Sequence, residues 1–263
     1  VLDDRSRGLD DRGKVANVPV PGLRPGCILD FTTTRRERAA TAPFRDLPLC
    51  SDLPVRRAVV AVQGATTAFR VEVGGGARRA DRDGALVVEV EDVPAVRGLA
   101  VTPADGKDLP HVTLAAQDAR WADLGAEYLR ELEPYLRPDA TLVATARRLT
   151  ASATAAADPA GSLLAEVQRQ LSYRAVMFGK RARIPQPAAS ICERTQGDCK
   201  DHALLLWHYL RGVGLPAHLA LVNSDGITPD LPDLDQFNHM VVALPTSTGW
   251  RILDGTAKFQ DLA

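Results

Sequence analysis

The sequence contains few aromatic residues, little net charge and no long apolar run. Aromatic residues make up 5% of the 263 residues, and the net charge is −1, with 32 basic and 33 acidic residues. A nucleic-acid surface needs clustered positive charge, and single-stranded ligands need aromatic stacking platforms, so neither is indicated. No apolar run approaches the roughly 20 residues that span a bilayer. We therefore expect no nucleic-acid partner and no transmembrane segment in this chain.

Cysteine is also scarce, with four residues at positions 27, 50, 192 and 199 and no CxxC pair among them. A disulfide framework would need a denser set of cysteines in a smaller chain. We expect mainly free thiols, so the question is which one is reactive. Cys27, beside Ile28, has the setting of a buried structural cysteine.

The first part of the chain has the pattern of β structure. Short runs with β-branched residues and alternating polarity predict strands over residues 26–34, 56–64, 67–76 and 85–93. In the last run, Leu86, Val88 and Val90 share one face. Glycines 74–76 are interpreted as a hairpin turn, and Asp83-Gly84 as a second turn. These features predict an antiparallel, β-sandwich-like domain over residues 1–115.

From residue 119 the periodicity becomes helical. It predicts helices over residues 119–136, 140–150, 162–176 and 198–214, with a small-residue link at 153–161. Gly212 or Gly214 is expected to end the last helix. Three strands are predicted to follow, over residues 217–223, 237–244 and 249–255. A helix followed by antiparallel strands indicates an α+β domain, which we place at residues 116–263.

Cys199 lies at the start of the predicted helix 198–214, after Gly197 and Asp198. A thiol at a helix N-terminus lies at the positive end of the helix dipole, near unpaired backbone N–H groups. Both favour the thiolate, which is the nucleophilic form. Lys200 adds a neighbouring positive charge. Most cysteines are structural, but this polar setting favours a reactive thiol.

His239 and Asp254 are candidates to serve that thiol, although each alone has an ordinary interpretation, as a packed strand residue and a turn residue. A four-residue turn at 246–249 would pair Pro245 with Trp250. His239 and Asp254 would then be diagonal neighbours on one face, with Cβ atoms roughly 7–8 Å apart. A slip of one residue would put them on opposite faces. The order Cys, His, Asp matches the nucleophile, base and orienting acid of thiol acyl transfer.

Three stretches of the sequence resemble a bacterial branch of the transglutaminase-like superfamily. The run "GDCKDHALLLWHYLRGVGLPAHLALV" is similar to its nucleophile block, "LPDLDQFNHMVVAL" to its histidine block, and "ILDGTAK" to its aspartate block, with Gly255 where proline is usual. Upstream, "VPVPGLRPGCILDF", "DLPVRRAVVAV" and "AQDARWADLGAEYLREL" resemble the preceding β-rich domain of unknown function and its connecting helices. The similarity covers nearly the whole chain and implies that it starts partway through the β-rich domain.

The resemblance implies a papain-like thiol fold in which Cys199, His239 and Asp254 are the nucleophile, the base and the orienting acid. It also implies an oxyanion donor upstream of the nucleophile, an aromatic or glutamine side chain, together with the backbone N–H of Cys199. Tyr173 and Gln196 are the candidates, although Tyr173 also fits a plain core position. Four further residues are counted as near the site: Asp198, Lys200, His202 and Asn238.

The predicted function is thiol-dependent acyl transfer or amide hydrolysis on a peptide, protein, amide or thioester substrate, with no cofactor. Two alternatives stay open: a catalytically weak or inactive binding or scaffold module, and an amide-forming acyltransferase of bacterial natural-product biosynthesis. The family favours an exported or periplasmic location if a signal segment precedes this chain, and a cytoplasmic one otherwise.

The sequence offers two possible metal sites, but the residue patterns favour neither, so no metal is predicted. Cys192, Cys199, His202 and His208 do not have the spacing of paired zinc ligands, and the two histidines lie on different faces of one helix. The acidic loop 225–235 is rich in proline and has no EF-hand pattern. We interpret it as a solvated loop on the substrate side.

Overall fold

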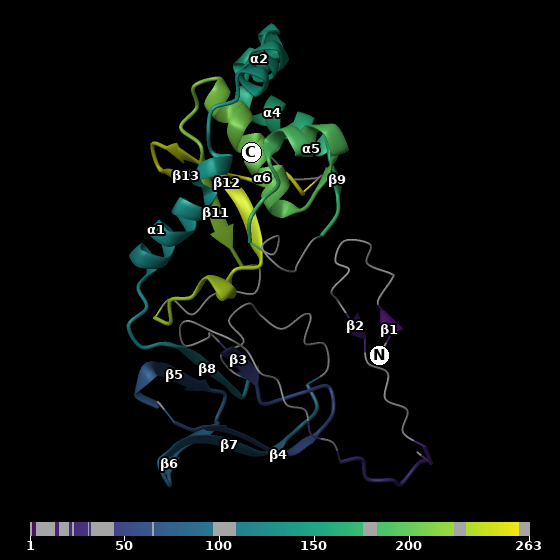
Figure 1. Ribbon diagram of the computed structural model, residues 1–263, viewed down its shortest axis with the longest axis vertical. Helices are drawn as coiled ribbons and strands as arrows, with labels where there is room; N and C mark the ends of the chain where they lie inside the picture. Colours follow the sequence, from purple (N-terminus) through teal and green to yellow (C-terminus); the bar gives the residue numbers. More distant parts are fainter. Residues whose placement is uncertain are drawn as a thin grey trace.

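The structure is a computed structural model that describes residues 2–3, 14–15, 21–22, 24–30, 32, 45–64, 66–96, 109–175, 183–223 and 230–257. Its elements form two parts, drawn one above the other in Figure 1. We call residues 45–116 the β sandwich and residues 121–257 the α+β unit. A short ladder between β1 (Leu2–Asp3) and β2 (Lys14–Val15) lies beside them. The mixed α+β fold with an N-terminal β-rich region confirms the predicted fold class.

The β sandwich consists of two antiparallel sheets of three strands each. One has the order β3 (Arg45–Pro48), β8 (His111–Ala116), β5 (Phe69–Gly74); the other has β4 (Val55–Val62), β7 (Ala85–Val93), β6 (Arg78–Arg82). A short 3-10 helix, Thr66–Ala68, precedes β5. The predicted inward face of β7 is confirmed, because Leu86, Val88 and Val90 are buried. Side chains of both sheets form one apolar core: Leu49, Cys50, Val88, Val90, Val93, Val112 and Leu114.

Two predictions about residues 26–34, which precede the β sandwich, are wrong. Residues 26–30 and 32 belong to no strand, and positions 31, 33 and 34 of the predicted run lie outside the described residues. Cys27 is exposed and Ile28 is 96% exposed, so Cys27 is no buried structural cysteine. An apolar run becomes a buried strand only where a partner strand and a second layer cover it. Cys50, which packs in the core between the two sheets, is the buried cysteine of the β sandwich.

The three glycines at 74–76 form no hairpin. β5 pairs with β8 whereas β6 pairs with β7, so this turn carries the chain from one sheet to the other. Gly75 has φ +62°, and a Cβ there would lie 2.0 Å from the carbonyl carbon of Leu109. The close approach of two backbones therefore requires glycine at this position. By contrast, the turn predicted at Asp83-Gly84 is confirmed, and it is a hairpin turn, because it joins the paired strands β6 and β7.

The helices of the α+β unit follow the predicted order but differ in extent. The predicted helix 162–176 runs instead from Pro159 to Gln170, because the Asp158 side chain accepts a hydrogen bond from the Gly161 N–H and caps it earlier. The link at 153–161 contains a short helix of its own. The elements are α1 (Trp121–Leu132), a 3-10 turn (Glu133–Tyr135), α2 (Ala140–Leu149), α3 (Ala153–Ala157), α4 (Pro159–Gln170), α5 (Ala188–Arg194) and α6 (Cys199–Gly212).

Helix α6 is the centre of the α+β unit. It packs against α2 and α4 and against the sheet strand β12. The helix is buried nearly all round, with Ala203, Leu204, Leu205, Leu206, Tyr209 and Leu210 each at most 2% exposed. Gly214, at φ +87°, ends it: the Leu215 N–H donates to the Leu210 carbonyl and the Gly214 N–H to the Arg211 carbonyl, as in a Schellman motif.

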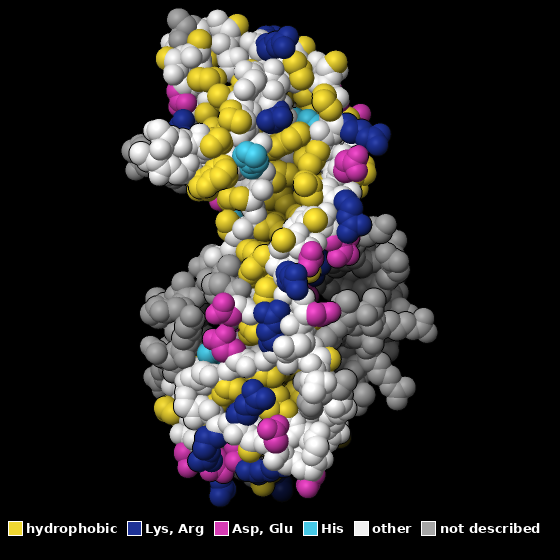
Figure 2. Space-filling model, turned by 90° about the vertical axis from the view of Figure 1, so that its left-hand side faces the viewer, with side chains coloured by type: hydrophobic (Ala, Val, Ile, Leu, Met, Phe, Trp, Pro, Cys, Tyr) yellow, Lys and Arg dark blue, Asp and Glu magenta, His cyan; other side chains and the backbone are white. Residues whose placement is uncertain are grey.

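The sheet beside α6 has the antiparallel order β11 (His218–Val222), β12 (His239–Thr246), β13 (Gly249–Leu253). Pro245 pairs with Trp250, which confirms the register predicted from the four-residue turn. The face of β12 and β13 that carries Met240, Val242 and Leu253 contributes to the core around α6. Figure 2 shows apolar side chains gathered over the upper part of the molecule and charged side chains over the lower part.

Arg70 of β5 connects the two parts. Its guanidinium donates to the carbonyl oxygens of Gln117 at 2.8 Å and Ala119 at 2.5 Å, at the entrance to α1. It also donates to the carbonyl oxygen of Asp230 at 2.9 Å. One side chain therefore holds the connecting segment and the loop that leads to β12. Among the helices in the described part of the chain, none combines the length and apolar character needed to cross a bilayer.

Candidate active site

Cys199 is the first residue of α6, where tight packing surrounds the helix start. The Asp201 carboxylate accepts a hydrogen bond from the Asp198 N–H at 3.2 Å, as in a capping box. It also accepts from the backbone N–H of Gln186 at 2.7 Å and from its side-chain amide at 3.1 Å. A Cβ on Gly197 would lie 2.4 Å from Asp201 Cβ, so this approach to the helix requires glycine. The thiol is thus presented by a rigid helix N-terminus, as the sequence predicted.

Lys200 and Asp198 form a buried ion pair on either side of Cys199. Their side chains are only 6% and 3% exposed. The sequence suggested that Lys200 adds a positive charge near the thiol, but the carboxylate of Asp198 largely neutralises that charge. A buried charge is tolerated when its partner lies within hydrogen-bonding distance. The pair therefore brings polarity to the site without a net charge.

His239 and Asp254 are in direct contact across β12 and the end of β13. Nε2 of His239 lies 2.8 Å from Oδ2 of Asp254. The other oxygen, Oδ1, accepts from the backbone N–H of Thr256 at 2.8 Å and from its hydroxyl at 2.7 Å. Burial raises the pKa of Asp254, but the hydrogen bonds from His239 and Thr256 outweigh burial and lower it to about 2. The carboxylate is therefore ionised at neutral pH.

His239 and Cys199 line the same cavity. The hydrogen bond to Asp254, and then the nearby Cys199 sulfur, raise the pKa of His239 to about 10, against the opposing effect of burial. Because Nε2 is engaged by Asp254, Nδ1 is the ring nitrogen left to face the thiol. The ring is therefore an imidazolium at neutral pH, with the carboxylate of Asp254 at Nε2.

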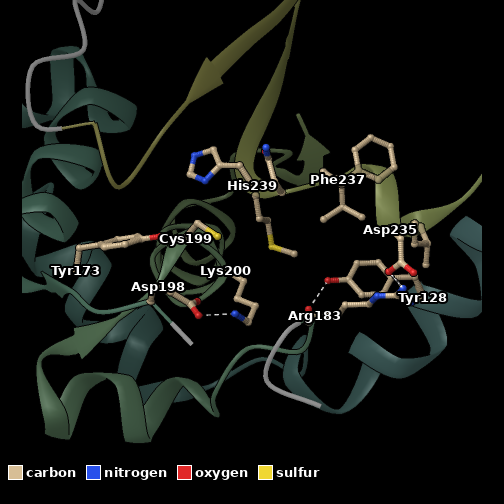
Figure 3. A pocket seen from close by; sticks show the side chains of 14 residues that line it. Tyr128, Tyr173, Arg183, Asp198, Cys199, Lys200, Asp235, Phe237 and His239 are labelled. Carbon is tan, nitrogen blue, oxygen red and sulfur yellow. Dashed lines mark hydrogen bonds and ion pairs between the residues drawn. The ribbon is translucent and has the colours of Figure 1, made fainter. Parts of the chain in front are cut away.

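A cavity of about 210 Å³ opens beside Cys199 and His239. Figure 3 shows Tyr173 on one side of Cys199, and Phe237, Asp235, Arg183 and Tyr128 on the other. The Tyr128 hydroxyl donates to the carbonyl oxygen of Arg183 at 2.6 Å. The cavity is lined by Tyr128, Tyr173, Ala175, Arg183, Asp198, Cys199, Lys200, Leu221, Leu234, Asp235, Phe237, Asn238, His239 and Met240.

The two oxyanion candidates lie in different places. Tyr173 belongs to β9 (Ser172–Tyr173), which pairs with β10 (Gln196–Gly197) directly before the nucleophile. It lines the cavity, and its hydroxyl points toward Cys199 in Figure 3. Burial and the negative charges of Cys199 and Asp198 raise its pKa, so its hydroxyl keeps the proton it would donate. Gln196 is exposed, and its side-chain oxygen accepts from Arg174 at 3.2 Å.

The remaining near-site residues support the site from behind or from its rim. The ring of His202 is 2% exposed, and its Nδ1 donates to the Asp198 carbonyl at 2.8 Å. Gly255 packs on it so closely that a Cβ would lie 2.9 Å from His202 Cβ, which accounts for glycine at this position. Asn238, on the rim, donates to Oδ1 of Asn223 at 2.9 Å.

Sequence reasoning missed two residues that hold Asp254 in place. Thr256 binds its carboxylate, and Gln168 of α4 donates to the carbonyl oxygens of Asp254 at 3.0 Å and Ala257 at 2.7 Å. The spacing Asp-x-Thr is typical of a turn closed by an aspartate side chain, so it offered a signal for Thr256. Gln168 lies 86 residues away and carries no such local signal.

The four cysteines are free thiols, as predicted. Within the described ranges, no three His, Cys, Asp or Glu side chains are grouped so as to hold a metal ion. His208 donates from Nε2 to the Tyr135 carbonyl at 2.9 Å, and burial lowers its pKa. Positions 225–229 of the acidic loop lie outside the described residues, and Asp235 at its end pairs with Arg183.

Comparison with known proteins gives one family and several similar structures. A family model described as the transglutaminase-like superfamily matches residues 143–255. A putative protease from Parabacteroides distasonis is 16% identical over 82% of this chain and 44% of its own, with a TM-score of 0.60. The chain thus spans less than half of that protein. The periplasmic domain of TgpA from Pseudomonas aeruginosa is 13% identical over 83% of this chain and 77% of its own, with a TM-score of 0.33. No curated protein sequence matches the chain.

Proposed function

Because residues 143–255 form a domain of the transglutaminase-like superfamily, we propose that the protein is a thiol-dependent enzyme that transfers an acyl group through a thioester on Cys199. One observation carries the proposal: Cys199 at the start of α6 and His239 line the same cavity, and Nε2 of His239 lies 2.8 Å from Oδ2 of Asp254. This arrangement is what a nucleophile, a proton carrier and an orienting acid require.

The first half of the reaction forms the thioester. The Cys199 thiolate attacks the carbonyl carbon of an amide, ester or thioester, and negative charge develops on the carbonyl oxygen. The backbone N–H of Cys199 and the Tyr173 hydroxyl are the donors that we assign to this oxygen. When the intermediate collapses, the His239 imidazolium gives its proton to the departing amine or alcohol. Asp254 keeps the ring oriented and stabilises its positive charge.

The second half releases the acyl group. His239, now neutral, accepts a proton from the incoming acceptor, which attacks the thioester and regenerates the Cys199 thiolate. Water as the acceptor makes the protein a peptidase or amidase, and an amine makes it a transamidase. We propose peptides, proteins or small amides and thioesters as acyl donors.

We also propose the division into a domain at 1–115 and a catalytic domain with its helical connection at 116–263. The apolar cores support it: the core of the β sandwich ends at Leu114, and that of the α+β unit begins at Tyr128. The Arg70 contacts then join two separately folded cores.

Thiol labelling tests the proposed nucleophile. Iodoacetamide should alkylate Cys199 faster than the exposed Cys27 at pH 6–7, because only Cys199 has an imidazolium partner. Mass spectrometry of digests measures both rates in one sample, so Cys27 serves as the internal control. His239→Gln should remove the advantage of Cys199. Equal rates at both cysteines in the unmodified protein would refute the proposal.

A further inference from the structure

The cavity beside Cys199 has an apolar wall made by side chains of β11, β12 and the segment before β12. Leu221, Leu234, Phe237 and Met240 form this wall. Met240 is 3% exposed, and the Phe237 ring lies 5.6 Å from the ring of Trp121. These contacts hold the wall in place before any ligand arrives, so it presents a preformed apolar surface next to the nucleophile.

The charged side chains that line the cavity have partners of opposite charge. Among the lining residues that the structure describes, Lys200 pairs with Asp198, Arg183 pairs with Asp235, and His239 pairs with Asp254 behind it. A charged ligand group would lose its hydration on entering and would compete for a partner that is already engaged. An uncharged group pays neither cost.

The two sides of Cys199 differ in exposure. Tyr173, on one side, is 55% exposed, whereas Tyr128, on the other, is 8% exposed. In acyl transfer the leaving group departs and an acceptor enters, while the acyl group stays on the enzyme through both steps. The leaving group and the acceptor therefore fit the open side at Tyr173, and the acyl group fits the more enclosed side.

We propose that the cavity is the acyl-group pocket and that it selects an uncharged, mainly apolar acyl group. This inference rests on the proposed function. A volume of about 210 Å³ is smaller than the roughly 300–1,000 Å³ of pockets for drug-sized ligands. The pocket therefore takes one aliphatic or aromatic side chain, or a short acyl chain, that precedes the reacting carbonyl.

Activated esters that differ only in their acyl group test this preference. In the reaction, the Cys199 thiolate forms a bond to the ester carbonyl, the bond to the leaving oxygen breaks, and p-nitrophenolate is released as the thioester forms. The probes are the p-nitrophenyl esters of 4-methylpentanoate, succinate and 4-aminobutanoate, which are apolar, negative and positive. We expect the apolar ester to acylate Cys199 roughly tenfold faster or more than either charged ester. Cys199→Ala, measured in parallel, corrects for background hydrolysis.

A charge placed on the apolar wall should change the preference. Leu234→Lys adds an unpaired positive charge inside the pocket, so succinate should become the fastest of the three acyl groups. Ile252→Lys is the matched control, because Ile252 is 44% exposed on β13 and does not line the cavity. It should leave the order of rates unchanged. Leu234→Ala, a milder change at the same place, should reduce the advantage of the apolar ester even if the lysine variant does not fold.

The iodoacetamide rate separates the two proposals. If Cys199 shows no advantage over Cys27, the proposed function fails. If Cys199 keeps its advantage but the three esters acylate it at equal rates, or a charged ester is fastest, the pocket proposal is overturned while the function stands. A folded Leu234→Lys variant that still prefers the apolar ester would also overturn the pocket proposal.

Discussion

The β sandwich and the α+β unit bury different kinds of side chain. Among the described residues, the buried polar side chains of the sandwich are Glu89 and Thr113. Glu89 lies on an outer face, and its partners Arg57 and Arg82 each have side chains that are 55% exposed. The α+β unit buries a larger polar set, most of it at one end of α6: Asp198, Lys200, Asp201, His202, His208 and Gln236.

The two parts differ in whether their ion pairs are buried. Both parts contain ion pairs, but Lys200 and Asp198 are almost fully withdrawn from water, whereas the arginines around Glu89 remain hydrated. Burying charge is expensive, and it is found where function requires a polar group at a defined position. The polar burial around Cys199 therefore supports the proposed site independently of the family match.

The largest expected effect is on activity and is confined to the α+β unit. His239→Gln removes the proton carrier, so acylation of Cys199 by an activated ester should fall about 10²–10⁴-fold. Burst kinetics with the apolar p-nitrophenyl ester measure this rate. His218→Gln is the matched control, because His218 is an exposed strand histidine that contacts Trp250. If His239→Gln acylates Cys199 at a rate within threefold of the unmodified protein, His239 is not the proton carrier.

The second effect is on stability and compares the two kinds of ion pair. Lys200→Met leaves the carboxylate of Asp198 buried without this cation. We expect the free energy of unfolding to fall by about 3–5 kcal/mol. Urea unfolding followed by circular dichroism measures it. A loss below about 1 kcal/mol would mean that the buried pair behaves like a surface pair and that the contrast between the two parts is not energetic.

The third effect depends on pH. The pKa of His239 is raised from its ordinary 6.5 to about 10, so the stability it contributes is complete below pH 6.5 and is lost as pH rises toward 10. The pKa of Asp254 is lowered from 3.8 to about 2, so its contribution is complete above 3.8 and is lost as pH falls toward 2. Asp254→Asn should therefore lower the free energy of unfolding most between about pH 4 and 6.5.

Within that window we expect the cost of Asp254→Asn to be about 1.5–3 kcal/mol, the range for a hydrogen bond to a charged group. Urea midpoints measured from pH 4 to pH 10 give the profile of the variant relative to the unmodified protein. Asp46→Asn in the β sandwich, where Oδ1 accepts from the Thr113 hydroxyl at 3.0 Å, is the control and should show no such window. If the urea midpoints of Asp254→Asn and the unmodified protein differed by a constant amount up to pH 10, the assigned His239–Asp254 pair would be contradicted.

The smallest effect is expected in the β sandwich. Arg57→Met removes a cation that lies 3.1 Å from Glu89, but the arginine side chain is 55% exposed, and Arg82 lies at the same distance from that carboxylate. The loss in unfolding free energy should be about 0–1 kcal/mol and should shrink as salt is added. Urea unfolding at low and high salt measures both. A loss in unfolding free energy as large as that of Lys200→Met would show that the exposed and the buried ion pair contribute equally to stability.

Features with a local cause were predictable. The turn between β12 and β13 and the alternation of their side chains determine the register, so His239 and Asp254 could be placed as neighbours before any coordinates. The start of α6 at Cys199 follows from its capping residues. The end of α4 was not predictable, because residues 172–173 leave the helix to pair with β10, more than 20 residues later.

The sequence by itself determined the change from β to helical periodicity near residue 119, the start of α6, the order of Cys199, His239 and Asp254, and the pairing of the two strands that carry the last two. These depend on residue periodicity, turn length and capping, which act over a few positions. Only the tertiary structure decided that Lys200 is neutralised, that Cys27 is exposed, and that Tyr128, Arg183 and Phe237 share one cavity. Those outcomes depend on segments far apart in the chain covering one another, and burial by distant residues leaves no periodic trace in the sequence.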